Sequence, residues 1–443
     1  GYTQVSLLEG GVDGWHRAGG ELFIDVNVPS KAFGELVESE RHTPSLAAEE
    51  VQALLDSQAD VVVLDARRFD EYQTMSIPTG ISVPGAELVL RARELAPDPA
   101  TRIIVNCAGR TRSIIGTQSL INSGIANPVS ALRNGTIGWT LAGQKLAHGQ
   151  ARRFAPTREE HRQIAARDAR RVADKARVGR ATLADLQRWQ QEPKRTTYLF
   201  DVRTPEEFEA GHLPGARSTP GGQLVQETDH VASVRGARLV LADDDGVRAN
   251  MSASWLAQLG WEVYVLDDLQ AANFSEQGAW VAPVPAPLQA ELISPHTLAE
   301  WLPHGDTAVL DFTPSVNYVK RHIPGAFWAL RAQLANALAK VPPAERYVLT
   351  CGTSQLARLA VAEVEAITGK PVFLLQGGTL NWIAEKLPLE EGETHLASPR
   401  IDRYRRPYEG TDSPKEAMQA YLDWEFGLVD QLARDGTHGF YVI

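Results

Sequence analysis

Cysteine is scarce in this sequence: its 443 residues contain two, Cys107 and Cys351. Two cysteines cannot build a disulfide framework, so we interpret both as thiols in a reducing compartment, the cytoplasm. Positive charge is also in short supply, because 44 Lys and Arg stand against 55 Asp and Glu and give a net charge of −11. That balance argues against nonspecific binding to nucleic acid or an anionic membrane. No run of about 18 apolar residues occurs, so no membrane-spanning helix is expected.

The composition is otherwise that of a globular chain, with a length that corresponds to about three domains. Hydrophobic residues make up 43% and charged residues 22%, which excludes a largely disordered chain. A short apolar strand followed by Gly and then Trp recurs at residues 5–15, 129–139 and 372–382, with a degraded copy at 263–274. We expect Trp15, Trp139 and Trp382 to pack in the core at one end of a sheet.

A second motif recurs three times, as an apolar strand that ends in Asp, a polar turn and a helix start. The Asp residues of the three copies are Asp65, Asp201 and Asp311. Each copy leads to a Pro-containing turn, which begins with His212 or His322 in the second and third copies. We interpret these histidines as hydrogen-bonding braces of the turn, because Ser76 stands at the matching position of the first copy.

Four copies of the first motif and three of the second indicate that the first repeat is present only as its last part. The expected segments are a remnant of a first repeat at 1–36, a complete repeat with Cys107 at 37–150, a helical linker at 151–178, a repeat with Asp243 in place of cysteine at 179–287, a repeat with Cys351 at 288–395, and a C-terminal tail at 396–443. The charged linker is interpreted as a solvated connecting helix.

Two further segments carry local predictions. Pro283, Pro285 and Pro287 predict a stiff, extended join between repeats. In the tail, one helix is expected from residue 414 to about 430. Its aromatic residues, Tyr421, Trp424 and Phe426, are expected to anchor the tail on the body of the protein.

Each complete repeat alternates short apolar strands with helices. In the first, residues 61–64 and 103–106 form strands, and residues 113–122 form a helix that ends at Gly124. Unbroken apolar strands that alternate with helices predict an α/β fold whose parallel sheet is covered by helices on both faces. Ligand sites in such sheets lie beyond the carboxyl ends of the strands, which is where Cys107 is placed.

The segment around Cys107 has the features of a nucleophilic thiol site. A loop at a helix N-terminus directs backbone N–H groups and the helix dipole toward one point, which favours an anion there. We therefore expect the Cys107 thiolate to be favoured over the thiol. Arg110 and Arg112 add positive charge and donors for an oxyanion, and Gly109 allows the tight turn. The pattern indicates a covalent thiol intermediate rather than a buried structural cysteine.

Taken together, these motifs resemble the rhodanese (thiosulfate sulfurtransferase) family. The resemblance rests on strand-Asp-x-Arg with a downstream Glu, on His-Ile/Leu-Pro-Gly-Ala, on Cys-Ala-Gly-Arg-Thr-Arg-Ser and on Leu-x-Gly-Gly-x-x-x-Trp, and it extends to about residue 395. It implies tandem rhodanese-like domains. It also implies that thiosulfate, or a similar donor, loads a cysteine with sulfane sulfur, which then passes to cyanide or to a thiol acceptor, including a protein thiol.

The resemblance assigns roles by position. Cys107 matches the persulfide-forming cysteine. The loop expected to hold the persulfide and the donor consists of Ala108, Gly109, Arg110, Thr111 and Arg112. Asp65 and Arg67 match a structural pair that braces the sheet edge and the loop. No cofactor and no metal are implied.

Two other functions were weighed against sulfur transfer. A rhodanese array could serve as a binding or regulatory module, or as a sulfur carrier with little turnover. The related cell-cycle dual-specificity phosphatases place five residues between the catalytic Cys and Arg, whereas four separate Cys107 from Arg112. The shorter loop favours a sulfur-sized ligand over a phosphate.

The remaining repeats depart from this pattern at the cysteine loop. Asp243 stands at the cysteine position of the second complete repeat, and Asp244 and Asp245 follow it, so we expect no persulfide there. Spaced ligands of the calcium-loop type are missing, which disfavours a metal site. The third complete repeat has Cys351 at the matching place, but its loop is uncharged until Arg358. Cys351 is therefore predicted as a possible second site, either a second persulfide station or a relic.

Overall fold

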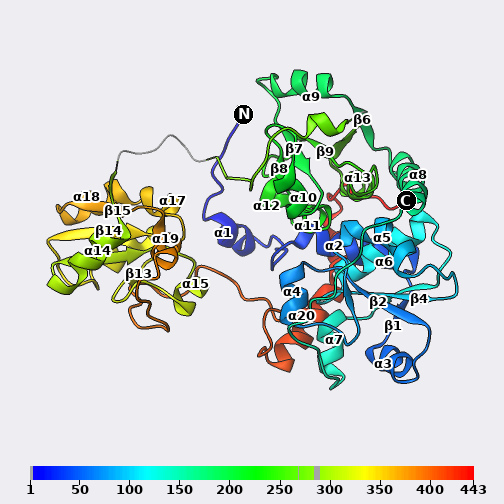
Figure 1. The fold of residues 1–443 in the computed structure, drawn as a ribbon, viewed down its shortest axis with the longest axis horizontal. Coiled ribbons are helices and arrows are strands. Elements are labelled where there is room, and N and C mark those ends of the chain that lie inside the picture. The colour runs from blue at the N-terminus through cyan, green and yellow to red at the C-terminus, as the bar shows by residue number, and fades with distance from the viewer. Residues whose placement is uncertain (1–2, 268, 284–289) are drawn as a thin grey trace. The chain divides into compact units, whose positions relative to one another are not determined.

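The computed structural model describes residues 3–267, 269–283 and 290–443, and it divides into two compact units. Unit 1 consists of Gly1–Trp280 and Pro407–Ile443, and unit 2 of Val281–Arg406 (Figure 1). Of the three prolines expected to form an extended join, Pro285 and Pro287 lie outside the described residues, as does the expected boundary at 287/288.

Three five-stranded parallel sheets form the framework, and all have the same strand order. The order is β1-β5-β4-β2-β3 in the first, β6-β10-β9-β7-β8 in the second and β11-β15-β14-β12-β13 in the third. We name the repeats built on these sheets the Cys107 repeat, the Asp243 repeat and the Cys351 repeat. The first two lie in unit 1 and the third in unit 2. The predicted parallel α/β fold in tandem is confirmed.

The strands are short and have these bounds: β1 (Ser45–Leu46), β2 (Val61–Asp65), β3 (Ile81–Ser82), β4 (Arg102–Asn106), β5 (Val129–Leu132); β6 (Gly179–Ala181), β7 (Thr197–Asp201), β8 (Arg217–Ser218), β9 (Arg238–Ala242), β10 (Glu262–Leu266); β11 (Glu291–Ile293), β12 (Thr307–Asp311), β13 (Phe327–Trp328), β14 (Arg346–Thr350), β15 (Val372–Leu375). The central residues of the inner strands are mostly apolar because both faces of each sheet are covered.

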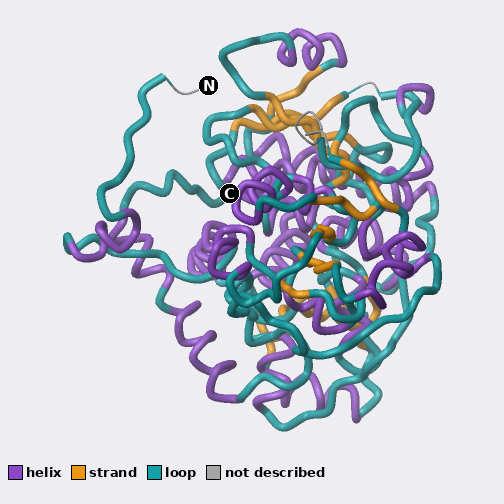
Figure 2. Tube along the Cα trace, turned by 90° about the vertical axis from the view of Figure 1, so that its left-hand side faces the viewer, coloured by secondary structure: helices purple, strands orange, loops and turns teal. Residues whose placement is uncertain are grey.

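Burial in the first sheet shows this directly. Along β2 and β4, successive side chains enter different cores: Leu64 and Ile103 belong to one cluster, and Val63 and Ile104 to another. Side chains alternate between the faces of a strand, so the two clusters are the two covered faces of the sheet. Figure 2 shows the short strands (orange) interspersed with helices (purple) along the chain.

The helices around the first sheet are α3 (Ala48–Asp56), α4 (Phe69–Thr74), α5 (Leu88–Leu95), α6 (Thr111–Ser123) and α7 (Gly135–Leu141), with the 3-10 turn η1 (Gly85–Glu87). Those of the Asp243 repeat are α9 (Leu183–Gln190), α10 (Pro205–Ala210), α11 (Gly221–Gln226), α12 (Thr228–Val231), α13 (Arg248–Gln258) and η2 (Ala271–Asn273). Those of the Cys351 repeat are α14 (Pro295–Trp301), η3 (Leu302–His304), α15 (Ser315–Lys320), η4 (Arg331–Gln333), α16 (Leu334–Leu338), α17 (Gln355–Arg358), α18 (Val361–Thr368) and α19 (Gly378–Ala384).

The recurring Trp residues behave differently from one another. Trp139 and Trp382 are buried, as predicted. Trp15 is 50% exposed, so the prediction that it packs in the core is wrong. It lies in α1 (Gly11–Arg17), none of whose residues is buried.

The linker helix is less solvated than expected. It forms α8 (Glu159–Lys175), and Ala165, Ala169, Val172 and Ala173 are buried. These residues recur at helical spacing, so they form one apolar face. That face joins the cores of the Cys107 and Asp243 repeats, while the other face remains charged and exposed.

The two terminal segments pack on each other and on the Cys107 repeat. Helix α2 (Val28–Arg41) contacts α6, and it runs without a break across the expected boundary at 36/37. The tail forms two helices, α20 (Lys415–Phe426) and α21 (Leu428–Asp435), where one helix was predicted. Gly427 separates them, and glycine is a poor helix former. Both helices contact α2.

Candidate active site at Cys107

Cys107 lies between the end of β4 and the start of α6, as the sequence predicts. Its side chain is buried, with 2% of the residue exposed. The thiol donates a hydrogen bond to Ser113 Oγ at 3.4 Å, and Ser113 Oγ donates to the Arg110 carbonyl at 2.8 Å. The sulfur is thus held against the first turn of α6.

The loop that follows Cys107 keeps its amides available. Its carbonyls are engaged, because Thr136 N donates to Cys107 O at 2.9 Å and Ile137 N donates to Ala108 O at 3.0 Å. In the described chain, the amides of residues 108–110 donate to no backbone acceptor. Hydrogen bonds on one side of the loop and unpaired donors on the other are typical of an anion cradle.

Gly135 explains why glycine recurs before the Trp of each repeat. It has φ +54°, and a Cβ there would lie 2.3 Å from Cys107 O. In the Cys351 repeat, Gly378 has φ +67° and a Cβ would lie 2.3 Å from Cys351 O. The glycine therefore permits α7, or α19, to approach the cysteine loop closely enough to bind its carbonyls.

Arg112 connects the loop to the second motif. It donates to both carboxylate oxygens of Glu71 on α4, at 2.7 and 2.8 Å. Burial raises the pKa of Glu71, but the charge and hydrogen bonds of Arg112, together with the charges of Arg67 and Arg68, outweigh it and bring the pKa to about 2. The same guanidinium acts on Cys107 and favours its thiolate. Arg112 is therefore a fixed positive charge beside the sulfur.

Arg110 has partners that the sequence analysis did not identify. It donates to Glu35 Oε1 at 2.7 Å and Oε2 at 2.8 Å, and it also pairs with Glu38, both on α2. Phe426 lies 4.3 Å from the guanidinium carbon, measured to the ring centroid. The expected role of Arg110 in binding an oxyanion stays a prediction, and its side chain is already neutralised by two carboxylates.

Asp65 and Arg67 form a buried ion pair at the carboxyl end of β2, and their predicted bracing role stays a prediction. Arg67 Nε and one terminal nitrogen donate to the two oxygens of Asp65 at 2.9 and 2.7 Å, and Arg67 also donates to the Met75 carbonyl. Asn106 Nδ2 donates to Asp65 Oδ2 at 2.9 Å. Asn106 directly precedes Cys107, so the pair is hydrogen-bonded to the end of β4 from which the cysteine projects.

The pKa of the Cys107 thiol is opposite in direction to the expectation. Burial raises it, and the charge of Arg112 and the hydrogen bonds to Ser113 offset only part of this effect. The ionised form of a thiol loses more than the neutral form when water is removed. The expectation that the loop alone favours the thiolate is therefore wrong.

The C-terminal segment covers the cysteine loop, which sequence reasoning did not anticipate. Tyr408, Met418, Tyr421 and Leu422 form one apolar cluster with Ala108 and Ile137. A Cβ on Gly109 would lie 3.2 Å from the Tyr421 ring. Helix α20 thus contributes to the burial of the Cys107 loop. Its apolar residues at 418, 421 and 422 have helical spacing and share one face.

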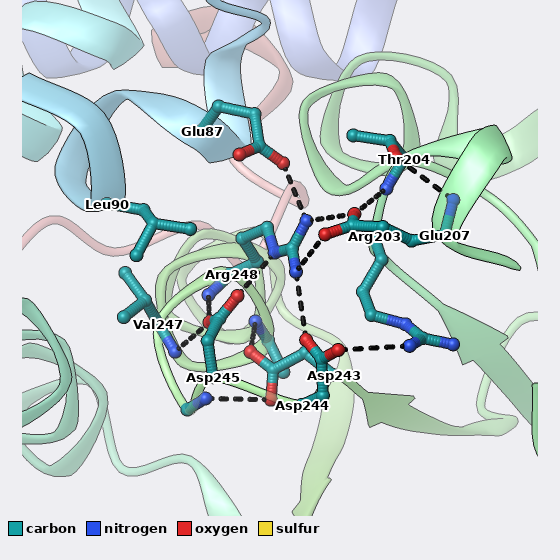
Figure 3. A network of polar contacts seen from close by, with 12 residues as sticks. Glu87, Leu90, Arg203, Thr204, Glu207, Asp243, Asp244, Asp245, Val247 and Arg248 are labelled. Carbon is teal, nitrogen blue, oxygen red and sulfur yellow. Dashed lines mark hydrogen bonds and ion pairs between the residues drawn. The ribbon is translucent and has the colours of Figure 1, made fainter. Parts of the chain in front are cut away.

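In the Asp243 repeat, acidic side chains occupy the loop (Figure 3). Asp243 accepts from the amides of Gly246 at 3.1 Å and Ala249 at 2.8 Å, and Asp245 accepts from Val247 N at 2.7 Å. These carboxylates take up the donors that an external anion would need. Burial and the charge of Asp245 raise the pKa of Asp243 well above its ordinary value.

Arg248 stands at the position of Arg112 and holds a buried network together. It pairs with Asp245 at 2.6 Å, Asp244 at 3.0 Å and Glu207, the counterpart of Glu71. It also reaches Glu87 of the Cys107 repeat at 2.9 Å (Figure 3). The loop of this repeat has become an internal contact between two repeats.

The Cys351 repeat keeps the hydrogen bonds to its loop carbonyls but loses the charges of the loop, and Ser354 has a left-handed backbone where Arg110 does not. Thr379 N donates to Cys351 O and Leu380 N to Gly352 O, both at 2.9 Å. Leu356 stands at the position of Arg112 and is 57% exposed. Cys351 is buried and is a free cysteine. Its activity stays a prediction.

The histidines that begin the Pro turns brace them. His212 Nδ1 lies 2.8 Å from the Phe208 carbonyl, and His322 Nδ1 lies 2.8 Å from the Tyr318 carbonyl. Each imidazole also stacks on the aromatic ring of the same residue. Among the helices in the described ranges, none has the length and apolar character needed to cross a membrane.

Comparisons with known proteins agree with this geometry. A family model described as Rhodanese-like domain matches residues 47–142, 182–268 and 294–385. The structure is similar to the crystal structure of a thiosulfate sulfurtransferase from Pseudomonas aeruginosa, with 74% identity and a TM-score of 0.97 over 100% of this chain and 84% of that chain. The uncharacterized protein YqhL of Bacillus subtilis (strain 168) is 37% identical over 73 residues, which are 16% of this chain. That match spans about half, 56%, of YqhL.

Proposed function

The chain belongs to the rhodanese-like family, and from that premise we propose that it is a sulfurtransferase that moves sulfane sulfur through a persulfide on Cys107. The donor is thiosulfate or a compound with a similar sulfane sulfur. The acceptor is cyanide or a thiol, including the thiol of a protein. The observation that carries the proposal is the position of Cys107 after β4, beside Arg112 and a loop with unpaired amides.

Two displacements at sulfur account for the reaction. The Cys107 thiolate attacks the outer sulfur of thiosulfate, a sulfur–sulfur bond forms to Cys107, and the bond inside thiosulfate breaks so that sulfite leaves with the electron pair. The acceptor then attacks the terminal sulfur of the persulfide. With cyanide this gives thiocyanate, with a thiolate it gives a new persulfide, and in both cases the Cys107 thiolate is restored.

The surrounding residues support these steps by charge and position. The amides of residues 108–112 would hold the persulfide anion, because backbone donors at a helix N-terminus favour negative charge. Arg112, fixed by Glu71, would offset the charge of the donor and of the thiolate. Asp65 and Arg67 would hold the strand end in place. Burial raises the pKa of Cys107, so loading is expected to accelerate as pH rises.

The test is to incubate the protein with thiosulfate and to measure its intact mass. We expect a gain of one sulfur atom, which peptide mapping places on Cys107, and we expect Cys107→Ser to abolish both the gain and sulfur transfer to cyanide. Cys351→Ser is the matched control, because Cys351 follows the corresponding strand and its loop carbonyls accept the same two hydrogen bonds, but Leu356 stands in place of the arginine. It is expected to have the smaller effect. Full activity of Cys107→Ser would refute the assignment.

A second candidate is a sulfur carrier, or a regulatory rhodanese array, with little turnover. The burial of Cys107 under α20 favours it, since a covered sulfur exchanges slowly with bulk reactants. Stable sulfur loading with a very low rate of thiocyanate formation would support the carrier, whereas rapid turnover would exclude it. The two free thiols fit a reducing compartment, so we propose the cytoplasm for either function.

A further inference from the structure

Helix α20 places one buried carboxyl group, that of Glu425, beside the Cys107 loop. Glu425 is 1% exposed. Its Oε1 accepts a hydrogen bond from the Tyr421 hydroxyl at 2.7 Å, while Oε2 is buried and has no hydrogen-bond partner. A Cβ added to Gly109 would lie 3.3 Å from Glu425 Oε2. The unpartnered oxygen therefore borders the loop whose amides are also unpaired.

The charges around this carboxyl are largely committed to other groups. Lys31 pairs with Asp25 at 2.8 Å, and Arg110 pairs with Glu35 and Glu38. The titratable and charged groups around Glu425 and its partner Tyr421 are Asp25, Lys31 and Glu35 from the N-terminal segment and α2, Cys107 and Arg110 from the loop after β4, and Tyr408 from the C-terminal segment. Neither of the two cations among these groups, Lys31 and Arg110, therefore pairs exclusively with Glu425.

Burial, together with the negative charge of Glu35, raises the pKa of Glu425 to about 8, although Tyr421, Lys31 and Arg110 act in the opposite direction. Below that pH the carboxyl is neutral and carries one O–H donor. Because Oε1 already accepts from Tyr421, the proton belongs on Oε2. A buried carboxylic acid that is kept neutral can serve as a hydrogen-bond donor to an anion.

We propose that Glu425 is a substrate-binding residue whose protonated carboxyl donates a hydrogen bond from Oε2 to the anionic sulfur donor at the Cys107 loop. This role rests on the proposed function, because it takes thiosulfate as the anion. The proton stays on Oε2 while the donor binds, so the proposal involves no proton transfer. Ionised Glu425 would instead lack the donor and repel a dianion.

The experiment measures thiosulfate binding by calorimetry in a Cys107→Ser background, in which no sulfur is transferred. Three forms are compared below and above pH 8: the parent Glu425, Glu425→Gln and Glu425→Met. With Glu425 present, the affinity is expected to fall about tenfold as pH rises through about 8, because one charged hydrogen bond is lost. Glu425→Gln keeps an N–H donor and cannot ionise, so its affinity should stay constant. Glu425→Met has no donor at this position, so it should bind thiosulfate about tenfold more weakly than Glu425→Gln at both pH values.

Two results would overturn the assignment: an equal fall in affinity with pH for Glu425 and Glu425→Gln, or binding to Glu425→Met below pH 8 as tight as binding to the parent at that pH. Circular dichroism at both pH values checks the fold, and if Glu425→Met does not fold, the comparison with Gln decides alone. The binding readout separates this proposal from the proposed function. Sulfur loading of Cys107 without the pH pattern refutes the role of Glu425 alone, and the pH pattern without loading refutes sulfur transfer alone.

Discussion

At the scale of single residues, the Asp that ends β2, β7 or β12 distinguishes the Cys351 repeat from the other two. Asp65 and Asp201 are buried against Arg67 and Arg203, respectively. Asp311 has Thr313 in place of that arginine, and one of its oxygens is buried without a hydrogen-bond partner. Burial raises the pKa of Asp311 to about 6, and hydrogen bonds from Thr313 offset only part of this.

Replacement of Asp311 by Asn should stabilise unit 2 at neutral pH. The folded protein binds the Asp311 proton more tightly than the unfolded chain does, so the contribution of this group to stability is present at low pH and is lost as pH rises through about 6. Asn carries no charge and removes that loss, which we expect to amount to roughly 2 kcal/mol above pH 6. Hydrogen exchange of the β12 amides in the intact chain, followed against pH, measures the gain.

Asp201→Asn is the matched control, because Asp201 of the Asp243 repeat corresponds to Asp311 but is paired with a cation, Arg203. It removes the buried carboxylate that Arg203 binds and leaves that arginine only the half-exposed Asp244, so it should destabilise the β7 region by about 3 kcal/mol. Opposite signs for the two variants support the argument. Increased protection at β7, or decreased protection at β12, would contradict it.

Single residues also mark the limit of sequence reasoning at the candidate site. Cys107 could be placed correctly because strand, cysteine and helix follow each other directly. Arg110 and Arg112 look equivalent in the sequence, yet Arg112 pairs with Glu71 and Arg110 with Glu35. Glu35 precedes Arg110 by 75 positions and lies on a helix with no motif, so nothing local identified the pair.

At the scale of elements, the approach of α7 to the cysteine loop depends on Gly135. Gly135→Ala would place a Cβ 2.3 Å from Cys107 O, and the two hydrogen bonds from α7 to the loop would be lost as the chains move apart. We expect a loss of stability of about 3 kcal/mol or more and at least about a tenfold slower sulfur loading. Urea unfolding and the rate of mass gain with thiosulfate measure both effects.

Gly143→Ala separates the effect of a Cβ contact from the free-energy cost of a left-handed alanine. Gly143 follows the same helix and has φ +76°, but a Cβ there would meet nothing within 4 Å. It should cost only the penalty of a left-handed residue, about 1–2 kcal/mol, and leave sulfur loading unchanged. Equal effects of the two substitutions on loading would show that the close approach does not matter.

Elements differ in how far the sequence predicts them. The strands and helices of the repeats were predictable, because unbroken apolar runs and glycine-ended helices have strong local signals. The cover over Cys107 was not. The spacing of Met418, Tyr421 and Leu422 indicates an apolar helix face, but the surface that it contacts, Ala108 and Ile137, is about 300 residues away in sequence.

At the scale of the whole molecule, the Cys107 and Asp243 repeats behave as one body. Phe33 and Ile114 share a hydrophobic cluster with Phe200 and Leu239, and Met251 enters the cluster of Leu88. The Cys351 repeat forms unit 2 with its own cores. The sequence repeats did not predict this difference, because repetition reveals the internal fold of each copy and says nothing about the surfaces between copies.

The loop of the Asp243 repeat supplies the polar part of that shared interior. Arg248 is buried and faces Glu87 of the Cys107 repeat as well as Asp244, Asp245 and Glu207 of its own. A buried cation surrounded by carboxylates cannot be removed without leaving those carboxylates uncompensated in a low dielectric. The repeat that has Asp243 in place of a cysteine thus uses its loop in a buried contact with the neighbouring repeat.

Arg248→Met should therefore destabilise unit 1 by about 3–5 kcal/mol, the range found when one partner of a buried ion pair is removed. Arg331→Met is the contrasting variant in unit 2, since the Arg331–Glu363 pair is nearly half exposed on both sides and should cost less than about 1 kcal/mol. Urea unfolding followed by hydrogen exchange resolves the two units in the intact chain. A loss for Arg248→Met no larger than that for Arg331→Met would mean that hydrophobic packing alone joins the two repeats.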